Sequence, residues 1–76
     1  MAYEKEFERF AKKIQKKIKS LRLEQGLSQE DLMQYELSLR TVQRIEKEGS
    51  PANITLLTIF KLCKAYGLKP HELMEL

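Results

Sequence analysis

The chain has 76 residues, and its 14 lysine and arginine residues against 11 aspartate and glutamate residues give a formal net charge of +3. A chain of this length forms one small domain with a modest core, which excludes an enzyme with a deep, dry cleft. Its 42% hydrophobic and 33% charged residues fit a compact soluble fold rather than a disordered chain. We therefore expect a single domain over residues 1–76.

The composition also excludes several kinds of site. One cysteine and one histidine cannot form an internal disulfide or close a four-ligand zinc site. No run approaches the roughly 18 apolar residues of a membrane span, and the charged first fifteen residues hold no signal-peptide core. No nucleophile–base pair, carboxylate pair or glycine-rich phosphate loop can be assembled. We expect no catalytic activity, cofactor, metal, membrane contact or small-molecule ligand, and a cytoplasmic location.

Helical periodicity accounts for most of the chain. The first helix is predicted from about Tyr3 to Gln25, because apolar residues recur there on one helical stripe: Tyr3, Phe7, Phe10, Ile14, Ile18 and Leu21. The three glycines each follow a helical stretch, where a residue in the left-handed conformation closes a helix: Gly26, Gly49 and Gly67. This pattern predicts an all-α chain.

Four shorter helices are predicted after the first. Ser28 is a good N-cap for a second helix over about residues 29–35, and Asp31 forms a weak capping box with it. Ser38 caps a third helix that runs to about residue 48. A fifth helix begins at Pro70. The fourth helix is capped by Asn53, and we expect its inward face to hold Ile54, Leu57, Phe60, Leu62 and Cys63, the last as a small core residue.

The second and third helices have the spacing of a helix-turn-helix, at about residues 28–48. Such a unit can place its second helix in the major groove of DNA. On that helix Val42 and Ile45 mark the buried side, and the opposite arc holds only basic and amide side chains: Arg40, Gln43, Arg44 and Lys47. Arginine can pair with guanine and glutamine with adenine, while Lys47 is better placed for a phosphate. The alternative interpretation is an ordinary solvated helix face.

Two segments, Leu27–Leu32 (LSQEDL) and Leu37–Glu46 (LSLRTVQRIE), resemble the Cro/CI-type (XRE family) helix-turn-helix of bacterial and phage repressors. The resemblance covers roughly residues 14–74. It implies a compact five-helix bundle of the lambda-repressor-like DNA-binding fold. It also implies that the partner is double-stranded DNA, bound at a palindromic operator by a homodimer.

Residue by residue, the resemblance implies three groups of functional positions. Base contacts fall on Leu39, Arg40 and Arg44, beside Gln43 on the same arc. Arg22 and Glu46 match a structural ion pair that is buried in this family. Phosphate or groove-edge contacts, which add to the one expected at Lys47, fall on Gln29, Ser38, Thr41, Ser50 and Asn53. Asn53 can alternatively be no more than a helix cap.

The chain departs from the family pattern at several positions. Met33 stands where alanine is common, Tyr35–Leu37 replaces the usual turn glycine, and the segment from Leu32 to Ser38 is one residue shorter than usual. Residues 1–12 extend the first helix. Their aromatic residues either pack over the last helix, which we favour, or form a dimer interface beside Leu73, Met74 and Leu76. The basic residues from Lys12 to Lys19 can reach flanking DNA, but we expect most of them to be solvated.

These patterns favour a sequence-specific, repressor-like transcriptional regulator that binds DNA. Within the same class, the chain is also similar in size to a restriction–modification controller protein or an antitoxin. From a different class, the alternative is a helical protein-interaction module that binds an acidic partner or a membrane surface. That module should expose an apolar groove or stripe.

Overall fold

The computed structural model describes residues 2–75, which form five helical segments and no strand. They are α1 (Ala2–Glu24), the 3-10 helix η1 (Glu30–Tyr35), α2 (Leu39–Glu46), α3 (Leu56–Tyr66) and α4 (Pro70–Met74). The predicted all-α class with five helices is therefore confirmed. None of the helices described is long and apolar enough to cross a membrane. Leu76, predicted to lie near a dimer interface, falls outside the described residues.

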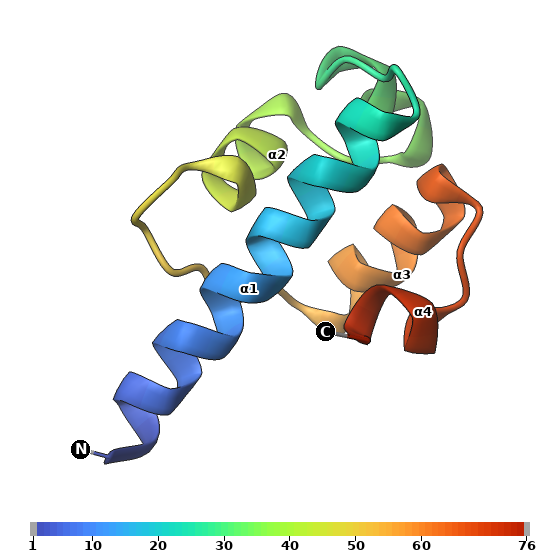
Figure 1. Ribbon diagram of the computed structural model, residues 1–76. Coiled ribbons are helices and arrows are strands. Elements are labelled where there is room, and N and C mark those ends of the chain that lie inside the picture. Colours follow the sequence, from blue (N-terminus) through green and yellow to red (C-terminus); the bar gives the residue numbers. More distant parts are fainter. Residues whose placement is uncertain (1, 76) are drawn as a thin grey trace.

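The long helix α1 is the axis of the molecule. Figure 1 shows α2 on one side of α1 and the pair α3 and α4 on the other, and α1 contacts all three. The 3-10 helix η1 closes the bundle by packing against both α2 and α3. Because α1 touches both sides, its residues can fix the position of α2 relative to the rest of the protein.

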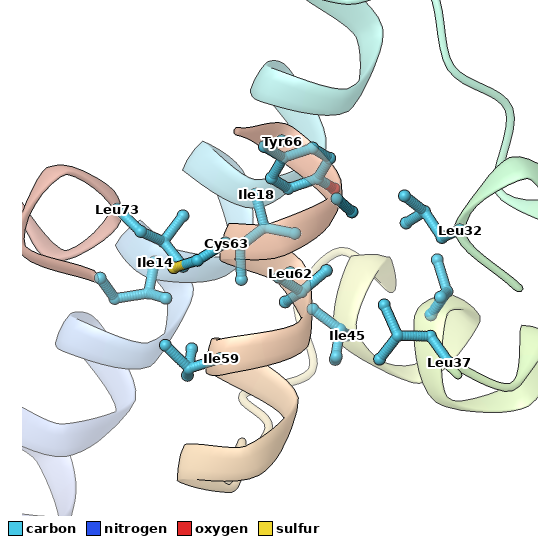
Figure 2. Packing of buried hydrophobic residues seen from close by; sticks show 12 residues of the cluster. Ile14, Ile18, Leu32, Leu37, Ile45, Ile59, Leu62, Cys63, Tyr66 and Leu73 are labelled. Carbon is cyan, nitrogen blue, oxygen red and sulfur yellow. The ribbon is translucent and has the colours of Figure 1, made fainter. Parts of the chain in front are cut away.

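The core lies between the described helices (Figure 2). Every helix contributes to it, and the six largest fully buried side chains come from all five: Ile18, Leu32, Val42, Ile45, Leu62 and Leu73. Burying one such aliphatic side chain contributes about 1.5–3 kcal/mol. A 9.0 kDa chain has few of them, so each matters to the stability of the bundle.

Capping residues set most of the helix ends. Ser38 accepts a hydrogen bond from the Thr41 N–H at 3.1 Å, which confirms it as the N-cap of α2. Gly26, with a φ of 69°, closes α1, and the next N–H, on Leu27, donates to the Arg22 carbonyl at 3.0 Å. No atom lies within 4 Å of a Cβ built on Gly26, so the left-handed conformation, not space, favours glycine there.

The second predicted helix is a 3-10 helix rather than an α-helix. The predicted capping box is present, since the Asp31 N–H donates to Ser28 Oγ at 3.1 Å and the Ser28 N–H donates to Asp31 Oδ2 at 2.7 Å. Backbone carbonyls of this segment accept hydrogen bonds from N–H groups three residues later in the chain. For example, the Glu36 N–H donates to the Met33 carbonyl at 3.3 Å. A 3-10 helix rises about 2.0 Å per residue against about 1.5 Å in an α-helix. The tighter winding therefore spans more length, which suits a segment one residue short.

The predicted start and inward face of the fourth helix are partly wrong. Thr55 rather than Asn53 caps α3, because its Oγ1 accepts from the Thr58 N–H at 3.2 Å. Leu57 and Phe60 are 61% and 52% exposed instead of buried. Leu62 and Cys63 are buried as predicted, and the rest of the buried face consists of Ile59, Ala65 and Tyr66. This helix is apolar around most of its circumference, so periodicity alone did not identify the side that meets the core.

The N-terminal part of α1 projects past the bundle (Figure 1). At about 1.5 Å per residue, its 23 residues are about 34 Å long, close to the 38 Å longest dimension of the protein. Ala11 is the first buried residue of α1. Phe7 and Phe10 line a groove with Met74 of α4 but stay 43% and 44% exposed, so the expected core over the last helix is incomplete.

Candidate nucleic-acid interface

The turn between η1 and α2 orients the second helix of the helix-turn-helix. Glu36 ends η1 in the left-handed conformation, with a φ of 61°. Leu37 then enters the core with 4% exposure, and Ser38 begins α2. One left-handed residue, one buried anchor and one cap therefore fix the direction of α2.

The two faces of α2 differ sharply in chemistry. Val42, Ile45 and Glu46 are buried against the bundle. The opposite side exposes Arg40, Gln43 and Arg44, with no acidic residue among them. The helix ends at Glu46 rather than at the predicted residue 48, so Lys47 lies in extended backbone just after it. Leu39 is half-buried in the first turn. The exposed face therefore offers arginine and amide donors that suit base edges in a major groove.

The predicted phosphate-contacting residues differ in what their side chains contact within the protein. Ser38 Oγ donates to Thr41 Oγ1 at 2.8 Å, so both hydroxyls already belong to the cap of α2. The Gln29 side-chain amide donates to Glu46 Oε1 at 3.3 Å, which turns it toward the protein. Asn53 is exposed but borders the apolar groove of Phe7 and Phe10 and does not line the hollow that holds Lys47 and Ser50.

Lys47 and Ser50 are the remaining two predicted phosphate-contacting residues. Both line an open hollow of about 310 Å³ between α1 and the loop after α2, together with three lysines of α1. Lys47 is exposed and Ser50 is half-buried. These two residues are therefore brought together, and their neighbours across the hollow are basic.

A buried ion pair joins the end of α1 to the end of α2. Arg22 donates from Nε to Glu46 Oε2 at 2.7 Å and from Nη2 to Glu46 Oε1 at 2.8 Å. Its Nη1 donates to the Leu27 carbonyl at 2.7 Å. The hydrogen bonds that Arg22 donates to Glu46 raise the pKa of Arg22, so the guanidinium stays charged. The Arg22 and Glu46 side chains are only 9% and 2% exposed, so the pair is buried between α1 and α2.

Gln15 is a positioning residue that was not predicted from the sequence. Its Nε2 donates to the carbonyls of Ile45 at 2.7 Å and Ser50 at 3.0 Å, and its Oε1 accepts from the Ala52 N–H at 3.1 Å. The bond to Ile45 holds the last turn of α2 against α1, and the bonds to Ser50 and Ala52 hold the loop after α2 there. The sequence contained one indication of this role: Gln15 is an uncharged polar residue that directly follows Ile14 of the apolar stripe.

Two other titratable groups of the core have no place in this interface. Burial raises the pKa of the Cys63 thiol and that of the Tyr66 phenol. Cys63 is 3% exposed, which confirms it as a small core residue. The Tyr66 hydroxyl is buried and has no hydrogen-bond partner among the described residues. Both groups stay neutral at ordinary pH and act only through packing.

Comparison with known proteins agrees with this geometry. A helix-turn-helix family model matches residues 18–73, which include η1, the turn and α2. No curated protein and no solved structure gave a significant match to the chain. The matched family is one of DNA-binding proteins, which are not typically enzymes. The match covers well over half of the chain, and we conclude that the protein belongs to the XRE-type helix-turn-helix family of DNA-binding regulators.

Proposed function

We propose that this protein is a repressor-like, sequence-specific regulator of transcription that binds a palindromic operator as a homodimer. The observation that carries the proposal is the exposed, acid-free face of α2 on a helix held from two sides. In this proposal residues 1–76 are one domain, with the helix-turn-helix over about 28–48 and a helical extension over 1–12. The protein would act in the cytoplasm, on the nucleoid when bound to DNA.

The proposed contacts divide into base and phosphate contacts. A bidentate arginine–guanine or glutamine–adenine pair discriminates against the wrong base by about 1–3 kcal/mol. Leu39 can contact a thymine methyl from the first turn. We assign base reading to Leu39, Arg40, Gln43 and Arg44. We assign phosphate contacts to Gln29, Ser38, Thr41, Lys47, Ser50 and Asn53. Of these, Lys47 has the best support, because it is exposed and directly follows α2.

The homodimer is supported by exposed apolar side chains on α1, α3 and α4, together called the apolar face, of which Phe7, Phe10, Leu56 and Met74 line one groove. Its members are each at least 39% exposed: Tyr3, Phe7, Phe10, Leu56, Leu57, Phe60 and Met74. At about 150–250 Å² for a full-sized aromatic side chain, they expose roughly 800 Å² together. A standard interface buries about 800 Å² on each partner, so this face is large enough for a second copy of the chain.

The apolar face is also what a protein-interaction module would need, so the test must examine DNA directly. The full chain is incubated with a random-sequence duplex library at fixed salt, and bound DNA is recovered from a gel shift and sequenced. We expect an inverted repeat with half-sites about one helical turn, ~34 Å, apart. Affinity for the selected site should fall with salt with a log–log slope of about −0.9 per phosphate neutralised. Salt-independent binding, or no enriched sequence, would contradict the proposal.

A further inference from the structure

A basic stripe of five residues runs along the face of α1 that borders the loop after α2: Lys5, Arg9, Lys12, Lys16 and Lys19. Its members are spaced by four and three residues, so they fall within an arc of about 80° on the helix. Glu8 borders the arc but does not lie inside it. Four members are exposed and Lys19 is half-buried. Most of its charge is therefore available to a partner.

The C-terminal part of the stripe forms one wall of the hollow beside α2. Lys12, Lys16 and Lys19 line it from α1, and Lys47 and Ser50 line it from the loop. About 30 residues separate the three lysines of α1 from Lys47 and Ser50 along the chain, so the sequence did not predict that the two groups meet. The tertiary fold brings four lysines around one open hollow. The hollow begins at the end of α2, which is the recognition helix of the proposed function.

The hollow keeps a net positive charge despite two nearby glutamates. Glu46 is neutralised by Arg22, with the closest N···O distance 2.7 Å. Glu48 has a side chain 91% exposed at the rim and lies 4.0 Å from the Lys19 Nζ. Within residues 2–75, no carboxylate pairs with Lys12, Lys16 or Lys47. Three free ammonium groups therefore face solvent around one cavity, an arrangement that favours an anion.

The hollow is also fixed in place relative to α2. Gln15 lies on α1 between Lys12 and Lys16, and it makes one hydrogen bond to the last turn of α2 and two to the loop that carries Lys47. A ligand bound in the hollow would therefore be held at a set position beside the recognition helix. The backbone of a duplex whose major groove holds α2 continues past the end of that helix.

From this arrangement we propose that Lys12 and Lys16, together with Lys47, bind phosphates of the DNA backbone that flanks the operator core. The proposal rests on the proposed function, and it extends the DNA-binding surface from the helix-turn-helix onto α1. The ligand is a row of phosphodiesters, which a lysine contacts as a point charge without regard to sequence. These contacts would add affinity and salt dependence but no base preference.

The test compares two duplexes that carry the selected operator, one trimmed to the core and one with about ten extra base pairs on each side. Binding is measured for the wild type, for Lys12→Gln/Lys16→Gln and for a charge-matched control, Lys13→Gln/Lys69→Gln. The control residues are exposed and lie outside the hollow. Circular dichroism and thermal melting establish that both variants fold like the wild type.

We expect the wild type to bind the flanked duplex more tightly than the trimmed one, and Lys12→Gln/Lys16→Gln to lose this gain. Its salt slope on the flanked duplex should fall by about 1.8 per protomer, at about 0.9 for each phosphate contact. The control should keep both the gain and the slope. Equal behaviour of Lys12→Gln/Lys16→Gln and the control would overturn the flanking site while leaving the proposed function intact. Failure of the wild type to bind any duplex would overturn both.

Discussion

The Arg22–Glu46 pair shows how much one pair of side chains contributes to the placement of the recognition helix. Each carboxylate oxygen accepts one guanidinium hydrogen bond, and the pair is almost fully buried. Removing one partner leaves the other as an uncompensated buried charge. The cost therefore falls on folding before it falls on DNA binding.

We expect Arg22→Ala to lower the free energy of unfolding by about 3–5 kcal/mol. Urea denaturation followed by circular dichroism measures this loss. The double variant Arg22→Met/Glu46→Leu should recover much of it, because apolar residues of similar volume often replace a buried ion pair at no net cost. A variant Arg22→Ala that unfolds like the wild type but no longer binds DNA would make Arg22 a phosphate contact instead.

Glu36 gives a second prediction at the scale of one residue. It holds the left-handed conformation at a φ of 61°, which costs a residue with a Cβ about 1–2 kcal/mol. Glycine avoids this cost but loses about 0.5–1 kcal/mol more backbone entropy on folding. Glu36→Gly should therefore stabilise the protein by about 0.5–1 kcal/mol, seen as a higher urea midpoint at an unchanged slope. Glu36→Ala keeps the Cβ and serves as the control, and an equal gain from alanine would contradict the explanation.

At the scale of an element, α2 separates its two tasks on opposite faces. Its buried face contacts α1 and η1, while its outward face carries the arginines and Gln43. A change on the outward face should therefore alter DNA recognition without altering stability.

We expect Arg40→Ala and Arg44→Ala each to weaken binding to the selected operator by about 1–3 kcal/mol and to relax preference at one base pair. Competition gel shifts with operators changed at single positions measure both effects. Lys47→Ala should weaken binding to every sequence about equally, which is the behaviour of a phosphate contact. If Arg40→Ala and Arg44→Ala also lose affinity uniformly, these arginines contact phosphates rather than bases.

The other short elements show the limits of local sequence signals. Hydroxyl caps at Ser28 and Ser38 and the glycines that close α1 and α3 act within a few residues, so the sequence predicted them. The start of α3 was missed by two residues because Asn53 and Thr55 are both good caps. Which of them is used depends on how the loop reaches α1, where Ala52 bonds to Gln15.

At the scale of the whole molecule, the apolar face predicts self-association. We expect the wild type to sediment as a dimer and Leu56→Glu/Phe60→Glu to sediment as a folded monomer. Both side chains are more than half exposed, so their replacement should leave the core intact. A monomer also loses the avidity of two linked half-sites, commonly about 10²–10⁴-fold.

A single charge elsewhere provides the control for this experiment. Leu23→Glu adds an acid at a side chain 58% exposed near the other end of α1, outside the apolar face. It should leave the dimer unchanged in sedimentation. A wild type that stays monomeric at all concentrations, alone and on DNA, would contradict the homodimer.

The sequence by itself determined the features that act over short distances along the chain. Periodicity and caps predicted five helices, and the arc of Arg40, Gln43 and Arg44 is set by the 100° step of a helix. The resemblance to the XRE family added the pairing of Arg22 with Glu46. These features need no knowledge of which helix packs against which.

Only the tertiary structure decided what depends on how helices meet. It selected the buried side of α3, left Leu57 and Phe60 in solvent, and used Gln15 to hold the loop after α2. It also brought Lys12 and Lys16 to Lys47 across one hollow. The physical reason is that burial and charge clustering depend on contacts between segments about 30 residues apart, and local periodicity contains no information about those contacts.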